Sequence, residues 1–564
     1  MKRCPECRRD YYDDSLLYCL DDGAALLEGP SSIPGSLRDE PQTAILHDTD
    51  SPSQAPTREQ IHTTNMPRFV KAATWSAGSF PVKIVGVLAV VLLIVVAGFF
   101  GLRYLRTDAK QISSVAVMPF VNDSGNADVD YLSDGMTDTL ISRLSQLTNL
   151  TVKARSAVFR YKGKQTDTRT VGQELNAQAI LNGHVVQRGD QLTVNLELID
   201  ASTENVIWAG QYDRKQADLV SIQNEITRDV LSKLTSKLSS SDEQKLSRSY
   251  TANPDAYRLL LQGRYFLDRS TREDTEKAIG YFQQAIGLDP ACALCSADLG
   301  RAYSIQAGRA WVPETEGFDR SRDATKKALS LDPDLAEGHA QLGRIQATYD
   351  LDLRAAEASY RRALELAPSS APVQDGAAVL FYKLGQFDEA ERLSHRAIDE
   401  DPLSPAFYHN LGLTCLAAGQ LAGSDEAFRK ALELAPERNV SNALLSIVLL
   451  DEGRTDDALA QAGREPDQVW KLWATAIINH RIGREAQSDA AIKQLVTEHS
   501  DGNAFQIAEV YAVRGDADRA FQWLETAYQK RDSGVTHAKV DPNLASLHND
   551  ARWGVYLKKL GLDG

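Results

Sequence analysis

The sequence lacks most of the signals by which enzymes are recognised. It contains no GxxxxGK[S/T] phosphate loop, no HExxH metal motif, no GxSxG nucleophile motif and no HRD…DFG kinase set. It also lacks an excess of basic residues, because 62 Lys and Arg stand against 77 Asp and Glu, a net charge of −15. Such a charge disfavours nucleic acid as a partner. We therefore expect a protein that is not an enzyme and does not bind nucleic acid.

Cysteine is also scarce. Six cysteines in 564 residues are too few and too scattered for a disulfide scaffold. Cys292 and Cys295 form a CxxC with no second Cys or His pair nearby, and the simplest interpretation is two small apolar helix residues. Oxidation of this pair is conceivable if the region lies outside the cytoplasm. Cys415 is predicted to be a small buried residue.

One segment lacks charge altogether. Residues 84–102 read IVGVLAVVLLIVVAGFFGL, which is long enough to cross a bilayer as a helix. The run begins too far from the N-terminus for a signal peptide. A buried core helix is the alternative, but an uncharged run so rich in Val, Leu and Ile is rare in soluble domains. We predict a single transmembrane helix at 84–102.

The first residues hold a cluster of thiols. Cys4 and Cys7 form a CxxC turn that can hold one metal between two thiolates, and Cys19 follows after eleven residues. The stretch resembles the zinc-ribbon heads of many bacterial membrane proteins, with Asp22 standing where that family usually has a fourth Cys. The resemblance implies one structural zinc on Cys4, Cys7, Cys19 and Asp22. Asp21 is a competing ligand, and a degenerate ribbon without metal is the alternative.

The orientation of the predicted span does not follow from charge. Three basic residues lie within twenty residues on each side of it, so the positive-inside rule is tied: Arg68, Lys71 and Lys83 before, and Arg103, Arg106 and Lys110 after. Three clustered thiols favour a reducing compartment, which places the head at 1–29 in the cytoplasm. Residues 30–80 are rich in Pro, Ser, Thr and Asp and are predicted to be a disordered linker. Everything after residue 102 is then expected outside the cytoplasm.

Residues 112–240 alternate between strand and helix patterns. Leu192, Val194, Leu196 and Leu198 alternate strictly with polar residues, which is typical of a half-buried strand. The same periodicities predict strands at 114–120, 150–154, 179–186, 192–198 and 206–212, with helices near 136–147, 171–176 and 217–238. We expect an α/β domain with a mixed sheet.

Four runs in this domain carry a family resemblance. They are SVAVMPFVNDSGNADVDYLSDGMTDTLISRLSQL, ARSAVFRYKGK, LNGHVVQRGDQLTVNLELIDASTENVIWAGQYDR and IQNEITRDV. Together they resemble the TolB amino-terminal-like domain, which precedes tetratricopeptide arrays in many bacterial signalling proteins. The resemblance implies a sensory or partner-binding module and supplies no catalytic residue.

The second half of the chain repeats. Successive prolines are separated by 43, 35, 34 and 34 residues: Pro290, Pro333, Pro368, Pro402 and Pro436. A period of 34 with small residues at fixed offsets is the tetratricopeptide (TPR) pattern, a helix–turn–helix stacked into a solenoid. We predict units at 254–290, 291–333, 334–368, 369–402 and 403–436, then degenerate units at 437–466, 467–499 and 503–531. The array spans 254–535, and 536–564 form a C-terminal cap.

Packing within each unit follows from the small residues. We expect glycines of the first helices to leave room for aromatic residues of the second: Gly300, Gly343 and Gly412, with Phe282, Tyr360 and Phe428. First helices line the concave surface of such arrays. Partner-facing side chains are therefore expected in 255–266, 335–346, 373–383 and 406–416, with Arg344 and Lys383 as exposed examples.

The whole chain is thus predicted to be multidomain: a zinc-ribbon-like head, one transmembrane helix, an α/β domain and an all-α TPR solenoid. Its expected function is a scaffold in the bacterial inner membrane that binds protein or peptide on the TPR concave face. One rival is a signal transducer whose outer part senses a ligand and acts on the cytoplasmic zinc ribbon. A third class is an enzyme, either unrecognised or acting through a partner.

Metal analysis of the purified head tests the first of these domains. We expect one zinc per chain in residues 1–30. Cys7→Ser should lower the zinc affinity far more than Asp22→Asn, because thiolate bonds dominate a soft site. A head that contains no stoichiometric zinc would contradict the prediction.

Overall fold

The computed structural model describes residues 2–3, 10–11, 27–28, 112–147, 149–234, 251–269 and 271–563. The chain divides into two compact units, 1–96 and 97–564. In the first unit the described residues form three short strands in an antiparallel sheet of order β2-β1-β3: β1 (Lys2–Arg3), β2 (Asp10–Tyr11) and β3 (Leu27–Glu28).

Several predictions fall on residues without a described structure. The expected zinc ligands Cys4, Cys7, Cys19 and Asp22, the linker and the segment 84–102 all lie outside the described residues. Within the ranges that are described, no helix is both long and apolar enough to cross a membrane.

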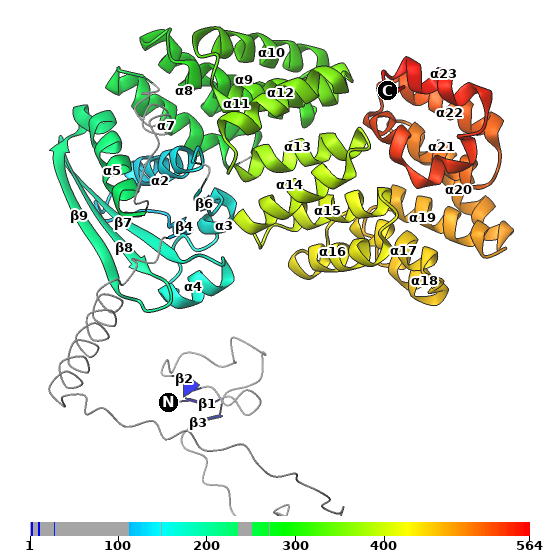
Figure 1. Ribbon diagram of the computed structural model, residues 1–564, viewed down its shortest axis with the longest axis horizontal. Coiled ribbons are helices and arrows are strands. Elements are labelled where there is room, and N and C mark those ends of the chain that lie inside the picture. The colour runs from blue at the N-terminus through cyan, green and yellow to red at the C-terminus, as the bar shows by residue number, and fades with distance from the viewer. Residues whose placement is uncertain are drawn as a thin grey trace, which may run out of the picture. The chain divides into compact units, whose positions relative to one another are not determined.

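The second unit begins with a mixed sheet (Figure 1). Its order is β6-β4-β7-β8-β9, with β5 paired to β7. The strands are β4 (Ser114–Val117), β5 (Val121–Asn122), β6 (Thr151–Val152), β7 (Ala179–Arg188), β8 (Gln191–Asp200) and β9 (Val206–Lys215). Strand β4 pairs in parallel with β6 and β7, and β5 pairs in parallel with β7. Strand β8 is antiparallel to both β7 and β9. The predicted α/β domain with a mixed sheet is confirmed.

Four α-helices complete this sheet domain: α2 (Asp130–Leu144), α3 (Arg155–Phe159), α4 (Thr168–Glu174) and α5 (Leu219–Leu234). The expected alternation of β8 is present, because Leu192, Val194, Leu196 and Leu198 are at most 1% exposed. In α5 the buried residues recur at helical spacing, and they share one core with the strands. The sequence analysis missed α3, which is only 5 residues long.

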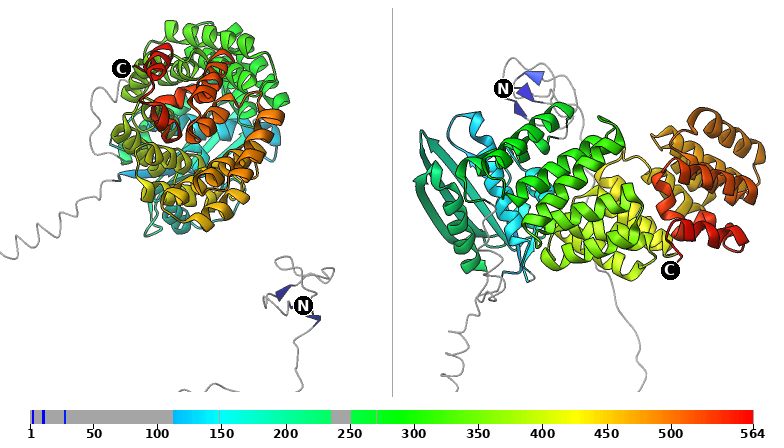
Figure 2. Two further views of the ribbon diagram at one scale, coloured as in Figure 1. Left: turned by 90° about the vertical axis from the view of Figure 1, so that its right-hand side faces the viewer. Right: turned by 90° about the horizontal axis from the view of Figure 1, so that it is seen from above.

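The rest of the unit is a solenoid of paired helices (Figures 1 and 2). The pairs are α7 (Pro254–Leu267) with α8 (Arg272–Leu288), α9 (Ala293–Gly308) with α10 (Glu314–Leu331), α11 (Ala336–Ile345) with α12 (Leu353–Leu366), α13 (Ala371–Lys383) with α14 (Phe387–Glu400), α15 (Pro405–Ala417) with α16 (Leu421–Leu434), α17 (Ser441–Asp451) with α18 (Thr455–Gly463), α19 (Gln468–Arg481) with α20 (Glu485–His499), and α21 (Ala504–Val513) with α22 (Ala517–Gln529). The chain ends in two 3-10 stretches, η4 (Ser533–Val540) and η5 (Pro542–Leu547), and in α23 (Ala551–Lys559).

Close glycine–aromatic contacts hold the pairs together. A Cβ at Gly343 would lie 2.8 Å from the ring of Tyr360, and one at Gly412 would lie 2.8 Å from the ring of Phe428. Both contacts were predicted. The expectation for Gly300 was wrong, because a Cβ there would meet Thr325 Oγ1 at 2.6 Å and the carbonyl of Ser321 at 3.0 Å. In that repeat, Thr325 faces the glycine where an aromatic ring does so in the neighbouring repeats.

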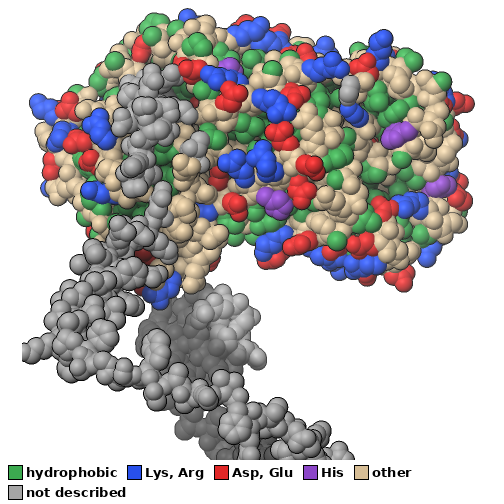
Figure 3. All heavy atoms as spheres, viewed as in Figure 1, with side chains coloured by type: hydrophobic (Ala, Val, Ile, Leu, Met, Phe, Trp, Pro, Cys, Tyr) green, Lys and Arg blue, Asp and Glu red, His purple; other side chains and the backbone are tan. Residues whose placement is uncertain are grey.

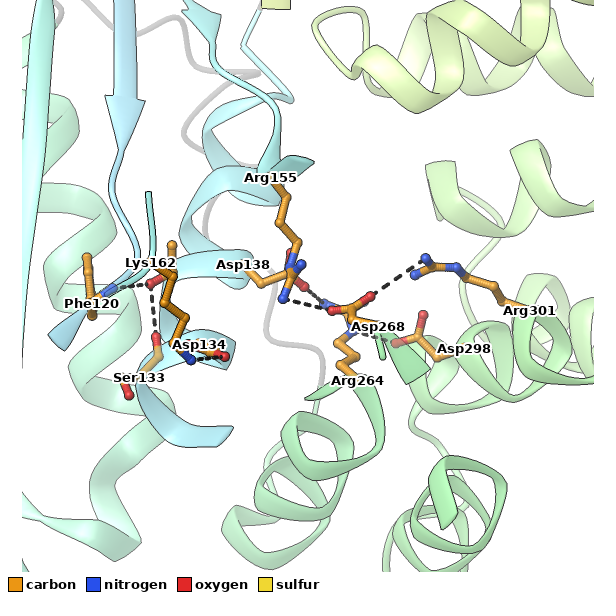
Figure 4. A network of polar contacts seen from close by, with 11 residues as sticks. Phe120, Ser133, Asp134, Asp138, Arg155, Lys162, Arg264, Asp268, Asp298 and Arg301 are labelled. Atoms are coloured by element: carbon orange, nitrogen blue, oxygen red, sulfur yellow. Dashed lines mark hydrogen bonds and ion pairs between the residues drawn. The ribbon is translucent and has the colours of Figure 1, made fainter. Parts of the chain in front are cut away.

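A network of buried charges joins the sheet domain to the first repeats (Figure 4). Arg264 of α7 pairs with Asp298 of α9 and, at 3.5 Å, with Asp138 of α2. Arg155 of α3 pairs with Asp138 at 3.3 Å and with Asp268 at 2.9 Å. Side-chain exposures of 10% for Arg264 and 6% for Asp298 show that little water reaches this contact. One set of ion pairs therefore links the sheet domain to the first repeat and the first repeat to the second.

Hydrogen bonds extend this contact to later repeats. Ser142 donates to Glu337 at 3.0 Å, and Ser369 N–H donates to the carbonyl of Ser145 at 3.3 Å. The N–H of Ala154 donates to the carbonyl of Glu400 at 3.0 Å. These bonds reach the start of α11, the residues just before α13 and the end of α14. The sheet domain and the first repeats thus form one packed body.

Two glycine substitutions test the packing of the solenoid. Gly343→Ala should lower the free energy of unfolding by about 1–3 kcal/mol, because the new methyl group overlaps the ring of Tyr360. Gly280→Ala is the matched control, since its Cβ would meet nothing within 4 Å. That change should be neutral or stabilising by up to about 1 kcal/mol, because alanine loses less backbone entropy than glycine in a helix. Equal effects in chemical denaturation would contradict the packing argument.

Candidate functional site

The repeats carry charged side chains of both signs on their surface. Figure 3 shows Lys and Arg side chains interspersed with Asp and Glu over the face that it presents. Many of these charges form short-range pairs within or between helices, as do Arg361 with Glu357 and Arg429 with Asp425. Such a mixed charged face is what a solvated surface requires. A binding site is therefore best sought among the first helices of the repeats.

The first helices divide into a covered part and an open part. In α7 the side chains of Tyr257, Leu260 and Leu261 are at most 2% exposed. The Tyr257 hydroxyl lies 3.1 Å from Thr139 Oγ1 in the sheet domain, and Leu261 packs against Gly135. Segment 255–266 was predicted to face a partner. Its buried face instead contacts the sheet domain of the same chain.

The open part contains a cavity of about 340 Å³. First helices α13, α15, α17, α19 and α21 supply one side of it, and the 3-10 stretches η4 and η5 supply the other. Its apolar wall is formed by Leu413, Leu416, Val440, Leu444, Trp470 and Phe505. Its polar lining includes Tyr382, His409, Glu509, Asp532, His537 and Asp541. An apolar wall with a few converging polar groups is the usual form of a ligand site.

The C-terminal segment closes this cavity by returning to the middle of the solenoid. The Tyr382 hydroxyl of α13 is hydrogen-bonded to His537 Nδ1 of η4, and their ring centroids lie 5.4 Å apart. Gly534 lies so close to Phe505 that a Cβ there would approach its ring to 2.6 Å. Asp532 caps η4 by accepting from the N–H of Gly534 at 2.9 Å. These contacts hold a 3-10 segment across the first helices instead of letting it continue the solenoid.

Three carboxyl groups meet at the cavity. Glu509 is 4% exposed, and one of its oxygens accepts from Asn543 Nδ2 at 3.2 Å. Burial, and after it the charge of Asp541, raises the pKa of Glu509 well above its ordinary value. Burial also raises the pKa of Asp541 and of Asp532. The cavity therefore concentrates acceptor groups whose charged form has little solvation.

Two other titratable groups of the inner surface are affected by burial. His409 is 8% exposed, its Nδ1 lies 2.8 Å from Ser441 Oγ, and burial lowers its pKa to about 3. It is a neutral, packed histidine. Lys383 was predicted to be exposed, which is wrong: it is 9% exposed, and burial lowers its pKa to about 8. The long side chain lies under the returning C-terminal segment, near His537.

The remaining predicted groups have different fates. Segment 406–416 contributes His409, Leu413 and Leu416 to the cavity. Arg344 is exposed, as predicted, and donates to Ser304 Oγ at 3.0 Å.

Cys292 and Cys295 form a disulfide in which both residues are 0% exposed, so the interpretation as two apolar helix residues was wrong. Cys415 is buried as expected. Within the described part of the chain, no three His, Cys, Asp or Glu side chains are grouped so as to hold a metal.

Sequence reasoning did not find the carboxyl groups of the cavity. One signal was available, because Glu509 is the single charged residue in the apolar helix AFQIAEVYAV. A lone carboxylate in such a helix faces either water or a specific partner. The meeting of Glu509 with Asp541 could not be anticipated, because it depends on the return of η4 and η5 across the solenoid.

Comparison with known proteins identifies two regions. Residues 110–229 match the family described as HilA/YgeH-like transcriptional regulator, second domain. Residues 376–439 match the tetratricopeptide repeat family. The chain is therefore a TPR protein with a small mixed-sheet domain. The resemblance of the sheet domain to the TolB amino-terminal-like domain stays a prediction.

Relatives share parts of the chain. Putative adenylate cyclase 3 of Rhizobium meliloti (strain 1021) is 30% identical over 230 residues, which are 41% of this chain and 39% of that protein. Type IV pilus assembly protein PilF of Pseudomonas aeruginosa is 29% identical over 141 residues, 24% of this chain and 54% of PilF. The chain spans well under two thirds of the length of these relatives.

Two solved structures are similar to part of the chain. The Pseudomonas aeruginosa pilF structure is 22% identical and covers 38% of this chain and 94% of its own, with a TM-score of 0.31. YrrB, titled a TPR protein with an unusual peptide-binding site, is 18% identical and covers 42% of this chain and 99% of its own, with a TM-score of 0.24.

Proposed function

We propose that this chain is a membrane-anchored TPR scaffold that binds a protein or peptide partner in the cavity between its first helices and η4–η5. The observation that carries the proposal is the cavity itself, which combines an apolar wall with buried polar groups. Peptide recognition by a groove needs apolar pockets for anchoring side chains and polar groups for register. The covered face of α7 leaves this part of the inner surface for a partner.

The same proposal includes the head and the anchor. Residues 84–102 cross the bacterial inner membrane once, and Cys4, Cys7, Cys19 and Asp22 hold a structural zinc on the cytoplasmic side. The sheet domain and the repeats then lie outside the cytoplasm. The disulfide between Cys292 and Cys295 supports this orientation, because disulfides persist in oxidising compartments.

A transducer is the second candidate. The match of residues 110–229 to the second domain of HilA/YgeH-like transcriptional regulators supports a regulatory role for the sheet domain. The partial identity with a putative adenylate cyclase points the same way, since such proteins signal. In this version a ligand of the outer part alters the state of the zinc ribbon. A chain without residues 1–30 that kept full biological activity would favour the plain scaffold.

Site-specific photocrosslinking tests the binding site. A benzophenone side chain placed at Leu413, which lines the cavity, should give a discrete adduct in intact membranes. The same group at Lys493, which is exposed on the outer helix α20, is the control and should give none. Adducts of equal yield at both positions, or none at either, would count against a scaffold that works through this cavity.

Reporter fusions test the orientation. A reporter enzyme that is active only outside the cytoplasm should be silent when fused after Phe80 and active when fused after Tyr250. Alkaline washing should leave the chain in the membrane fraction, because a spanning helix is not released by loss of charge pairing. A silent fusion after Tyr250 would reverse the topology, and release by alkali would remove the span.

A further inference from the structure

We propose that the cavity receives a basic side chain, an arginine guanidinium or a lysine ammonium, of an extended peptide partner, and that Glu509 and Asp541 are its receptor. This inference rests on the proposed function and assigns the chemistry of the partner. It follows from three observations: a buried carboxyl oxygen to which no N–H group donates, the lack of an ion pair between either acid and a Lys or Arg among the described residues, and an apolar wall in the same cavity.

The first observation concerns Glu509. Its side chain lines the cavity although the residue is 4% exposed. Oε1 accepts from Asn543 Nδ2 at 3.2 Å, whereas no N–H or hydroxyl group donates to the buried Oε2 within the described residues, and the other polar neighbour of the side chain is the carboxyl group of Asp541. A buried acceptor without a donor destabilises the folded state. Glu509 is nevertheless among the residues that line the cavity, into which a donor can enter.

The second observation concerns the neighbours of Glu509. Asp532 is already satisfied, because it accepts from the N–H groups of Phe505 at 3.0 Å and Gly534 at 2.9 Å. Asp541 accepts from the N–H of Asn543 at 2.8 Å and keeps acceptor capacity. In the part of the chain that is described, neither Glu509 nor Asp541 forms an ion pair with Lys or Arg. The pair thus presents acceptors that are not paired with a Lys or Arg among the described residues.

The third observation is the wall opposite these acids. Leu413, Val440 and Leu444 offer apolar surface to the methylene stem of a lysine or arginine, and such stems pack readily against apolar groups. The ring of Trp470 is part of the same lining and can take a cation on its face. A volume of about 340 Å³ accommodates one long side chain together with its backbone.

A metal ion fits the site less well than an organic cation. Among the described residues no group of three potential ligands is placed to hold a metal. Two carboxyl groups beside an apolar wall match a planar or tetrahedral donor on an alkyl stem instead.

The proposal implies that binding is linked to protons. Burial and the opposing carboxyl raise the pKa of Glu509, and burial raises that of Asp541, so the empty pair keeps a proton that an entering cation displaces. Affinity for a cation should therefore rise with pH. The titratable and charged groups of the surrounding elements are Asp532, Tyr382 and His548, which interact with the pair, and His537 with Lys383 beside it.

Short peptides test the inference on the purified full-length chain. The probes are fluorescent, terminally blocked heptapeptides of sequence AALXLAA, where X is Arg, Lys, Gln or Glu, and anisotropy reports binding at pH 6, 7 and 8. The Arg and Lys probes should bind on the order of tenfold more tightly than the Gln probe, because their hydrogen bonds are charge-assisted. Affinity for the Arg and Lys probes should increase with pH, and affinity for the Gln probe should not.

Substitutions locate the effect. Glu509→Gln keeps the shape and the acceptor for Asn543 but removes the charge, so it should abolish most of the preference for Arg over Gln. Glu498→Gln, at an exposed acid on α20, is the matched control and should change nothing. If Glu509→Gln lowers the unfolding temperature, Asp541→Asn provides a second variant with the same expected loss.

The outcomes separate this inference from the proposed function. Equal affinities for the Arg and Gln probes, or a preference that survives Glu509→Gln, would overturn the basic-side-chain receptor. If photocrosslinks from Leu413 still formed in that case, the scaffold would stand and only the chemistry of its partner would be wrong. No binding of any probe, together with no crosslink, would overturn both.

Discussion

The arrangement of the second unit depends on one buried guanidinium. Arg264 lies between the carboxylates of Asp298 and Asp138, in a contact that brings together the first repeat, the second repeat and the sheet domain. A buried ion pair contributes little net stability, but removing one partner leaves a buried charge and costs about 3–5 kcal/mol. The contact therefore acts mainly as a specificity device. Alternative placements of the sheet domain would leave Arg264 without Asp138.

This docking determines which part of the inner surface remains for a partner. The face of α7 packs against α2, and hydrogen bonds from Ser142 and Ala154 carry the contact as far as the end of α14. Further along, the solenoid turns until η4 returns to α13, where His537 meets Tyr382. Arg354 and Asp563, 3.6 Å apart, join α12 to the chain end in the same closure. The sheet domain thus covers one end of the inner surface, and η4 and η5 cover the other end. The cavity lies between η4–η5 and the first helices.

Local rules carried the prediction of the fold a long way. The period of 34 and the glycine–aromatic pairs predicted the solenoid, and the alternation in β8 predicted the sheet, because each of these signals depends on neighbours in one repeat or one strand. Lys383 failed for the opposite reason. Its helical position indicates the inner surface, but only the fold of residues more than 150 positions away determines that the surface is covered there. The disulfide between Cys292 and Cys295 and the contact between Glu509 and Asp541 likewise could not be predicted from local sequence patterns, because both depend on the three-dimensional fold.

The two sets of buried charges differ in a way that bears on function. At the docking surface Lys162 meets Asp134 at 2.6 Å and Arg264 meets Asp298, so these charges face the opposite sign. In the cavity Glu509 meets another carboxyl. Both acids have a higher pKa in the folded state than in the unfolded state. Their contribution to the free energy of unfolding is therefore fully present below their ordinary pKa values and is lost as the pH rises through the raised values.

A cation that enters the cavity supplies the missing charge. It binds the folded state alone, and so it stabilises the closure of η4 and η5 in proportion to its concentration relative to its dissociation constant. Partner binding and closure of the C-terminal segment are then coupled through the same two carboxyl groups. A local conflict between two buried carboxyl groups is expected where function requires it.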